Sequence, residues 1–410
     1  MQTILHLGGI FMKLELNMIQ TLALSIAVFY LGSYLKKKIS VLDKFCIPAP
    51  VIGGLIFAIV NLILRLTGTV ELTLDVTLQS PFMLVFFTTI GLGASFKMIK
   101  QGGKGVFFFS IAAISLVVFQ DILGIVVAKA IGANPLLGII SGSVTMTGGH
   151  ATGATWGATF ENAYGLTGAS ATAMAAATFG LVCGSLLGGP IGKRLIKKNN
   201  LTPESYEFVA STTVKEEDVN FKSLFDTLSI IFICMGIGTI LEYYFSKLGS
   251  TLPQYIYPMI VAAIVINFGE KTKTFKINTT CTDILGNIGL NVFLSMALVN
   301  LQLWQLKETA GPLLILLFAQ AVLMAFFSYF ITFKLMGKDY DAAVISSGHC
   351  GFGMGATPNG MANMDSITTK FGASPKAFFV LPVVGAFFVD ILNSLIIGGF
   401  VSVLSLMHLI

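Results

Sequence analysis

The fold is decided by two glycine-rich polar stretches, SGSVTMTGGHATGATWGATFENA at residues 141–163 and GKDYDAAVISSGHCGFGMGATPNGMANM at residues 337–364. Both are too polar to face lipid and too apolar to be ordinary surface loops. Glycine at this density favours irregular backbone, and such backbone persists at membrane depth only where it is buried in protein or lines a wet cavity. We therefore predict two re-entrant hairpins, at about residues 135–163 and 338–364.

The composition predicts a membrane protein. Of the 410 residues, 55% are hydrophobic and only 11% are charged, whereas soluble domains carry about 25% charge. Together with a mean hydropathy of +0.84, this excludes a soluble enzyme and a nucleic-acid-binding protein. The five cysteines show no CxxC spacing and HExxH is absent. We therefore expect no disulfide framework, no transition-metal site and no cofactor.

Ten apolar stretches approach the length of about 20 residues that a membrane-spanning helix needs. The predicted spans are residues 17–35, 47–68, 80–96, 105–128, 165–190, 223–246, 253–269, 283–303, 311–333 and 375–407. The predicted fold class is thus an all-α polytopic membrane protein. Positive charge is retained on the cytoplasmic side. Placing both termini outside makes 20 of the 25 Lys and Arg residues cytoplasmic, together with a hydrophilic linker at 199–220.

Four short motifs recur in both halves of the chain, in the same order and at offsets of 199 to 206 residues. They are TL at 21 and 227, GH at 149 and 348, GAT at 153 and 355, and GAS at 168 and 372. Each half holds five predicted spans, and an odd number makes the second copy enter the membrane upside down. We predict two inverted repeats, residues 1–198 and 221–410. This architecture is typical of secondary transporters, although some channels share it.

Inverted repeats would bring the two hairpin tips together near the membrane centre. There, backbone N–H groups at helix ends can bind an anion, and hydroxyls or unwound carbonyls can bind a cation. A packing interface of small residues is the alternative for each stretch, but the Thr, Ser and Asn residues beside the glycines favour a binding site. A nucleotide site is disfavoured because GxxxxGK[ST] is absent.

Ionisable residues within predicted spans are costly and therefore informative. Asp121 and Asp390 lie within spans, and no Lys or Arg is predicted at comparable depth. A mobile cation or a substrate amine is the expected partner of Asp390, with a polar tie between helices as the alternative; for Asp121 the two interpretations are balanced. His150 and His349 occupy matching motif positions, where they are either structural residues or groups linked to substrate or protons.

Five motifs are spread along most of the chain: IPAPVIGG (47–54), TGGHATGA (147–154), GHCGFGMGATP (348–358), ANM (362–364) and VLPVVGAFFVDILN (380–393). Together they resemble the bacterial sodium/glutamate symporter family. The resemblance implies sodium-coupled uptake of L-glutamate across the inner membrane by alternating access, two oppositely oriented re-entrant loops and a homodimer. By similarity to related transporters it also implies an elevator movement. Asp121 departs from the family pattern, where an uncharged residue is expected.

The expected site residues come from the two hairpins and the last span. The expected substrate-binding residues are Thr145, Thr147, Gly148, Gly149, His150, Thr152, His349, Gly351, Gly353, Gly355, Thr357 and Asp390. The expected sodium-binding residues are Ser143, Thr145, Ser347, Thr357, Asn359, Asn363, Asp390 and Asn393. The expected partners are L-glutamate, Na⁺ as the co-transported ion, and the lipid bilayer.

Two alternatives remain beside a glutamate symporter, namely a symporter for another small dicarboxylate and an ion channel built on inverted repeats. An enzyme is not expected, because the GxGD motif of an intramembrane hydrolase is absent: Gly353-Met354-Gly355 is followed by Ala356.

Overall fold

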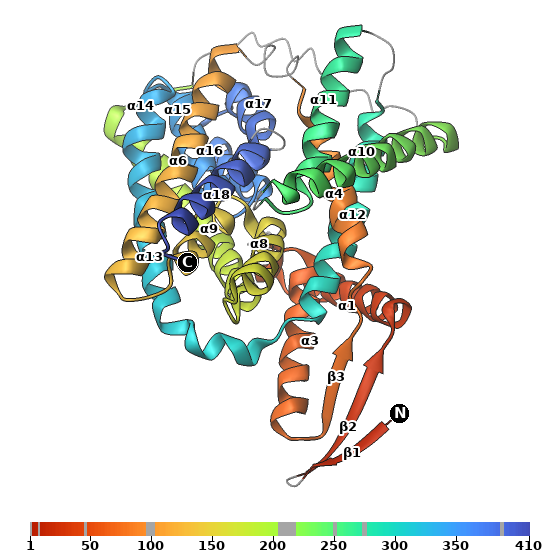
Figure 1. Cartoon of the computed structure of the whole chain (residues 1–410). Coiled ribbons are helices and arrows are strands. Elements are labelled where there is room, and N and C mark those ends of the chain that lie inside the picture. Colours follow the sequence, from red (N-terminus) through yellow and green to blue (C-terminus); the bar gives the residue numbers. More distant parts are fainter. Residues whose placement is uncertain are drawn as a thin grey trace.

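The computed structural model of the chain describes residues 2–6, 9–44, 47–95, 103–203, 219–248, 252–272, 277–385 and 389–410. The fold is mostly helical (Figure 1). Within the described residues, eight helices have the length and hydropathy of membrane spans. They are Met18–Lys38, Ala49–Leu66, Gly103–Ala130, Ala169–Asn199, Phe221–Lys247, Thr279–Val299, Ala310–Leu335 and Val389–Leu406.

Every predicted span contains a helix, but not all of these helices are of full length. The third and seventh spans form α4 (Gln79–Gly93) and α11 (Ile256–Thr272), of 15 and 17 residues. The last predicted span is occupied by two helices, α17 (Pro375–Val383) and α18 (Val389–Leu406). Most of the predicted linker, residues 204–218, lies outside the described residues.

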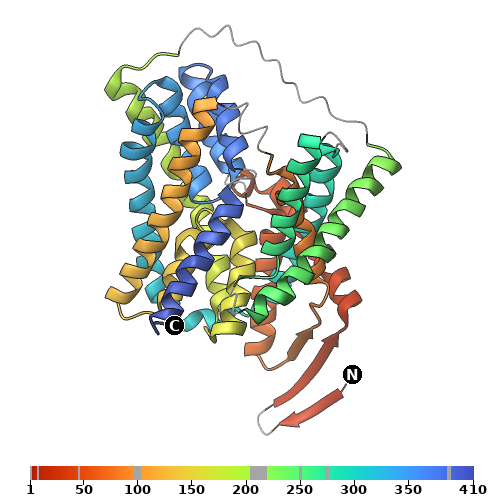
Figure 2. The ribbon, with the colours of Figure 1, turned by 45° about the horizontal axis from the view of Figure 1, so that its top comes forward.

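The helices pack in two groups that lie side by side in Figures 1 and 2. The first group consists of α1 (Met18–Lys38), α3 (Ala49–Leu66), α4, α10 (Phe221–Lys247), α11 and α12 (Thr279–Val299). The second group consists of α6 (Gly103–Ala130), α7 (Pro135–Ile139), η1 (Ile140–Val144), α8 (Gly149–Tyr164), α9 (Ala169–Asn199), α13 (Ala310–Phe326), η3 (Phe327–Thr332), α14 (Phe333–Leu335), α15 (Tyr340–Gly353), α16 (Thr357–Phe371), α17 and α18. Each group thus combines helices from both halves of the sequence.

Short segments complete the chain: α2 (Ser40–Lys44) follows α1, and the 3₁₀ helix η2 (Leu303–Glu308) precedes α13. Close helix contacts depend on small residues. A Cβ on Gly32 of α1 would lie 2.0 Å from the Ala49 carbonyl oxygen of α3, and one on Gly53 would lie 2.0 Å from that of Val28. Glycine at both positions therefore lets these two helices touch through their backbones.

The prediction of an all-α fold is wrong at one point, because a three-stranded sheet lies at the N-terminal end. Strand β1 (Gln2–His6) is antiparallel to β2 (Gly9–Leu16), which is parallel to β3 (Val70–Leu74). The residues MKLEL at 12–16 and VELTL at 70–74 alternate apolar and polar side chains, which is the period of a half-buried strand. These strands, of five to eight residues, are too short to form apolar stretches of helix length.

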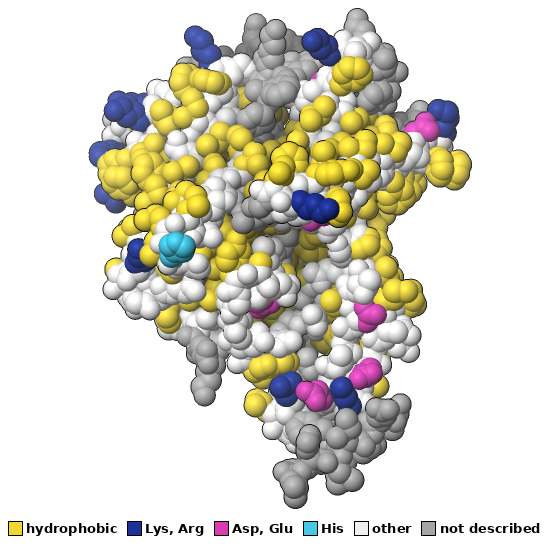
Figure 3. Space-filling view, in the orientation of Figure 1, with side chains coloured by type: hydrophobic (Ala, Val, Ile, Leu, Met, Phe, Trp, Pro, Cys, Tyr) yellow, Lys and Arg dark blue, Asp and Glu magenta, His cyan; other side chains and the backbone are white. Residues whose placement is uncertain are grey.

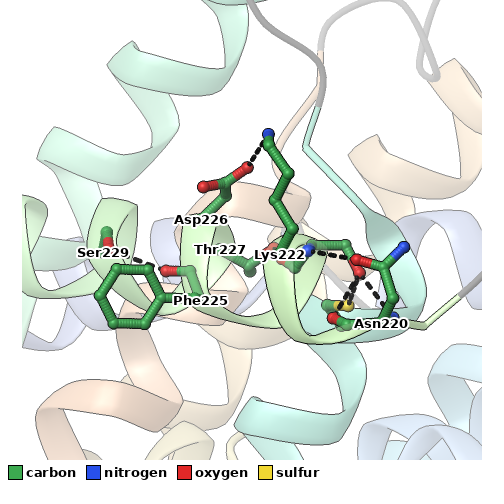
Figure 4. Close-up of polar contacts among 8 residues, drawn as sticks. Asn220, Lys222, Phe225, Asp226, Thr227 and Ser229 are labelled. Carbon is green, nitrogen blue, oxygen red and sulfur yellow. Dashed lines mark hydrogen bonds and ion pairs between the residues drawn. The ribbon is translucent and has the colours of Figure 1, made fainter.

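Side-chain caps define where helices begin. The side-chain oxygen of Asn220 accepts a hydrogen bond from the Ser223 N–H (2.9 Å) at the start of α10, and Lys222 forms an ion pair with Asp226 one turn later (2.8 Å; Figure 4). Asn17 caps α1 in the same way. Both caps satisfy N–H groups that a helix leaves without internal partners.

Apolar side chains cover much of the outer surface (Figure 3). Charged side chains in that view gather mainly at the upper left edge and around the strands at the bottom. Large exposed hydrophobic residues occur on α1, α3, α10 and α13. This distribution fits a protein whose flanks contact lipid.

Candidate functional site

The first glycine-rich stretch forms two short helices joined by a turn. α7 and η1 lead into the turn at residues 145–148, and α8 leads out. Gly142 interrupts the helical backbone within η1 (φ −86°, ψ −134°), and Gly149 opens α8 with φ +62°. Residues other than glycine rarely adopt positive φ, so glycine at 149 allows α8 to start sharply after the turn.

The second stretch has the same plan with a shorter tip. The Asp339 side chain caps α15 by accepting a hydrogen bond from the Ala342 N–H (2.7 Å). α15 ends at Gly353, residues 354–356 are non-helical, and α16 begins at Thr357 with Pro358 in its first turn. Proline fits there because it lacks an N–H that the helix could not use.

The two tips touch each other. A Cβ on Gly149 would lie 2.8 Å from the carbonyl oxygen of Gly355. The buried side chain of Gln120, on α6, bridges the tips: its Oε1 accepts a hydrogen bond from the Thr147 hydroxyl (2.7 Å), and its Nε2 donates to the Gly353 carbonyl (2.7 Å). The backbone carbonyl of Gln120 in turn accepts a hydrogen bond from Gln320 Nε2 (2.7 Å).

Sequence reasoning missed Gln120 and Gln320, because it considered only ionisable residues inside the spans. Both glutamines interrupt otherwise apolar runs, VVFQDIL and LLFAQAV, 200 residues apart. An amide at the centre of an apolar helix must find a hydrogen-bond partner. The same argument that identified the carboxylates could therefore have identified these residues.

Helix N-termini point toward the junction of the tips. α8 and α16 have no side-chain cap. Among the described residues, the backbone N–H groups of His150, Ala151 and Thr357 donate no hydrogen bond. Free N–H groups at a helix N-terminus, where the helix dipole is positive, form a binding site for an anion.

The two carboxylates predicted within membrane spans, those of Asp121 and Asp390, have different environments. Asp121 is fully buried and accepts hydrogen bonds from the backbone N–H and the hydroxyl of Ser143 (2.8 and 2.9 Å), so it ties α6 to η1. Asp390 is half-buried, and its carboxylate accepts no hydrogen bond from any described residue. Asn393, one turn further along α18, donates to the Ser143 carbonyl (3.2 Å), while its Oδ1 has no partner in the described structure.

Amide side chains hold α16 against α9. Asn359 Nδ2 donates to the Leu181 carbonyl (2.9 Å) and Asn363 Nδ2 to the Gly184 carbonyl (2.9 Å), while the Ser347 hydroxyl contacts the Asn363 carbonyl (3.4 Å). A Cβ on Gly180 would lie 2.3 Å from the Met354 carbonyl oxygen. The described structure leaves Asn359 Oδ1 buried without a hydrogen-bond partner.

The two histidines do not occupy equivalent places. His150 follows the first tip and its Nε2 contacts the Thr178 hydroxyl of α9 (3.1 Å). His349 precedes the second tip, and its Nδ1 contacts the Thr332 hydroxyl (2.8 Å). The ring of Phe109 lies 5.0 Å from the His349 ring, measured between centroids. The helices that follow the two tips, α8 and α16, begin 208 residues apart (357 minus 149), but the two GH motifs are only 199 residues apart. The GH motifs therefore do not mark equivalent positions in the two hairpins.

The remaining predicted site residues lie at or beside the tips. Thr145 is buried and its hydroxyl donates to the Ile140 carbonyl (2.6 Å). Thr152 is buried one turn into α8, after the N-cap residue Gly148. A Cβ on Gly351 would lie 2.5 Å from the backbone of Asn359, so glycine there allows the two arms of the second hairpin to pack closely.

The repeated GAS motif anchors the base of each hairpin. Ser170 donates hydrogen bonds from its N–H and its hydroxyl to the Glu161 carboxylate of α8 (2.9 and 2.7 Å). The Ser374 hydroxyl donates to the Asp341 carboxylate of α15 (2.6 Å), which also lies 3.6 Å from the Lys376 ammonium. A serine of each motif therefore holds one arm of the hairpin to the helix that follows it.

A cleft of about 930 Å³ lies between the two helix groups. Residues of α8, α9 and η2 line it together with the segments that precede α4 and α11. Among the described residues that line it, the ionisable ones are Asp75 and Glu161, and none is Lys or Arg. Hydrogen bonds from the hydroxyl and the backbone N–H of Thr77 lower the pKa of Asp75 below its usual value, so this carboxylate is charged at neutral pH.

Comparison with known proteins connects these features to a family. A sequence model described as "Sodium/glutamate symporter" matches residues 14–373. The chain belongs to the sodium/glutamate symporter family. The residues that match include both hairpins and the Gln120 bridge between their tips.

Curated relatives align over nearly the whole length of this family member. The sodium/glutamate symporter of Haemophilus influenzae is 42% identical over 383 residues, covering 92% of this chain and 95% of its own length. The sodium/glutamate symporter of Escherichia coli K12 is 41% identical over 390 residues, covering 93% and 97%. A solved structure of the sodium proton antiporter MjNhaP1 from Methanocaldococcus jannaschii aligns with a TM-score of 0.41 and 14% identity, over 95% of this chain and 99% of that chain.

Proposed function

We propose that the chain is a sodium-coupled symporter that takes up L-glutamate across the bacterial inner membrane by alternating access. The observation that carries this proposal is the junction of the two hairpin tips at Gly149 and Gly355. Beside it lie helix N–H groups and buried oxygen atoms that have no hydrogen-bond partner among the described residues. Membership of the family and the names of the curated relatives supply the substrate and the coupling ion.

The residues at the junction suit the charges of glutamate and sodium. The free N–H groups at the start of α8 bind a substrate carboxylate, helped by the hydroxyl of Thr152. The Asp390 carboxylate binds the substrate ammonium or a sodium ion. The Oδ1 atoms of Asn359 and Asn393 supply further sodium ligands, since hard cations prefer oxygen. We propose no ion other than Na⁺ for these residues.

Two inverted five-helix repeats, each with a re-entrant hairpin, form the scaffold of this site. The meeting of the tips and the similar plan of the two hairpins support this arrangement. Strand β1 and the end of α18 both lie toward the lower end of the molecule in Figure 2, which supports an even number of crossings. The outside location that we propose for both termini rests on the distribution of Lys and Arg.

The movement we propose is an elevator displacement of the second helix group against the first. The division of the helices into two groups supports it, as does the small polar contact between them: the Tyr255 hydroxyl accepts a hydrogen bond from Trp156 Nε1 (3.1 Å) and contacts the Ser394 hydroxyl (3.0 Å). The first group also carries the least buried spans, α1 and α10, which are suited to the interface of a homodimer.

Energetics bound the coupling ratio. A tenfold sodium gradient supplies about 1.4 kcal/mol per ion, and each net charge that crosses 100 mV supplies about 2.3 kcal/mol. One sodium ion with monoanionic glutamate is electrically neutral and gains only about 1.4 kcal/mol, whereas two sodium ions gain about 5 kcal/mol. Steep accumulation therefore requires at least two sodium ions per glutamate.

Uptake of radiolabelled L-glutamate into liposomes that contain the purified chain tests the proposal. We expect uptake to require an inward sodium gradient, to fail with potassium or a proton gradient alone, and to increase with an inside-negative potential. Competition by other small dicarboxylates measures the substrate range. Folded protein that takes up no glutamate under any gradient, or that conducts sodium without a second solute, would refute glutamate symport.

A further inference from the structure

A cluster of basic side chains ends α9, far along the chain from the hairpin tips. Lys193, Arg194, Lys197 and Lys198 are all exposed, and with Pro190 they line an open cavity of about 740 Å³. Basic side chains also gather at the left edge of Figure 3, where α9 ends in Figure 1.

These four cations have no anionic partner in the described structure. The Arg194 guanidinium and the Lys198 ammonium instead lie over the same ring, that of Tyr329, at 5.8 and 5.7 Å from its centroid. Other basic residues form ion pairs, such as Lys222 with Asp226 and Lys376 with Asp341. Like charges one helical turn apart repel each other, so the cluster is suited to an anionic ligand.

An apolar surface adjoins the cluster on the same face of α9. Leu186 and Pro190 are exposed. Pro190 precedes Lys193, Arg194 and Lys197 by three, four and seven residues, and Leu186 lies four residues before Pro190, which places these side chains on one side of the helix. Phe330, next to Tyr329, is also exposed. The face is therefore apolar at one end and basic at the other. An anionic phospholipid has the complementary layout, with apolar acyl chains at one end and a negatively charged headgroup at the other.

We propose that this face of α9 binds an anionic phospholipid of the bilayer. The headgroup phosphate lies among the four cations, with an acyl chain along Leu186 and Pro190. Basic pockets at the cytoplasmic ends of spans bind such headgroups. Because α9 packs closely against the second hairpin through Gly180 and Gly184, the bound lipid stabilises the hairpin-bearing helix group.

The test compares thermal unfolding midpoints of the purified full-length chain in detergent with added phosphatidylglycerol, cardiolipin, phosphatidylcholine or inorganic phosphate. We expect the two anionic lipids to raise the midpoint and the other two additions to leave it unchanged. A variant with Lys193→Gln, Arg194→Gln, Lys197→Gln and Lys198→Gln loses the shift, and Tyr329→Leu reduces it. The four basic residues are exposed and Tyr329 is partly buried, so the midpoint of each variant without added lipid serves as its folding control.

The matched control is a variant with Lys36→Gln, Lys37→Gln and Lys38→Gln, which removes a similar charge cluster at the end of α1. It should retain the full lipid-dependent shift. Equal stabilisation by phosphatidylcholine, or an unchanged shift in the fourfold variant, would overturn the lipid site. Stabilisation by inorganic phosphate alone would assign the cluster to a free anion instead. Because these midpoints need no transport, they are independent of the glutamate proposal.

Discussion

Replacing Gln120 with leucine tests whether the junction of the hairpin tips is essential for transport. Gln120 is fully buried on α6, and its amide is the hydrogen-bond partner of both tips, through Thr147 and Gly353, each at 2.7 Å. Leucine has a similar volume, so the substitution removes the two hydrogen bonds without opening a large cavity.

The expected effect follows from the groups left without partners. A buried donor or acceptor that loses its partner costs about 1–3 kcal/mol, so the Thr147 hydroxyl and the Gly353 carbonyl together cost about 2–6 kcal/mol. A change of about 3 kcal/mol alters an equilibrium constant by roughly 150-fold. We therefore expect Gln120→Leu to lower the rate of sodium-driven glutamate uptake by about two orders of magnitude or more and to lower the unfolding midpoint.

Uptake into proteoliposomes and thermal unfolding measure these effects. The matched control is Gln320→Leu, because Gln320 donates a single hydrogen bond, to the Gln120 carbonyl, and its Oε1 already lacks a partner in the described structure. Gln320→Leu should lower the uptake rate and the unfolding midpoint clearly less than Gln120→Leu does. Wild-type uptake and stability in Gln120→Leu would refute the view that this amide holds the two tips together.

Three further tests concern other parts of the site. Asp390→Asn should abolish sodium-driven uptake and leave the unfolding midpoint unchanged. Asp121→Asn should retain uptake, because asparagine can still accept a hydrogen bond from the Ser143 N–H and donate one to the Ser143 hydroxyl. Equal losses of uptake in the two variants would contradict this difference. Gly149→Ala should slow uptake, since a positive φ costs an alanine about 1–2 kcal/mol and the new Cβ would press on the Gly355 carbonyl. The control is Gly132→Ala, which has a similar positive φ (+70°) but open space around the new Cβ. A comparable loss of uptake in Gly132→Ala would refute a specific role of the tip. Ser374→Ala removes a hydrogen bond to the Asp341 carboxylate, and such bonds are worth about 1.5–3 kcal/mol. It should therefore lower the unfolding midpoint and leave the KM for glutamate unchanged. A raised KM would argue against a purely anchoring role of Ser374.

The sequence predicted the features that depend on solvent exclusion. Apolar stretches of helix length located a helix in each predicted span, because a backbone in lipid must satisfy its own hydrogen bonds. The same reasoning predicted a re-entrant hairpin in each glycine-rich stretch, and the structure has a turn at 145–148 and another at 354–356. Their insertion from opposite sides of the membrane stays a prediction.

Other features could not be read from residue type alone. Asp121 and Asp390 are the same residue in similar apolar surroundings of the sequence, yet Ser143 satisfies only Asp121. That difference depends on which helix packs against each carboxylate. His150 and His349 show the same limit, since motif spacing does not reveal that they lie on opposite arms of their hairpins.

The division of polar groups between the two halves explains how sodium and glutamate can depend on each other. The free N–H groups that attract an anion lie mainly on α8, in the first half of the chain. The oxygen atoms that lack partners in the described structure include those of Asn359 and Asn393, in the second half, where Asp390 also lies. Because the tips meet, each ligand neutralises charge introduced by the other. Most of the free N–H groups thus come from the first half and the oxygen atoms from the second, so the contact between Gly149 and Gly355 is the structural basis that we infer for coupling.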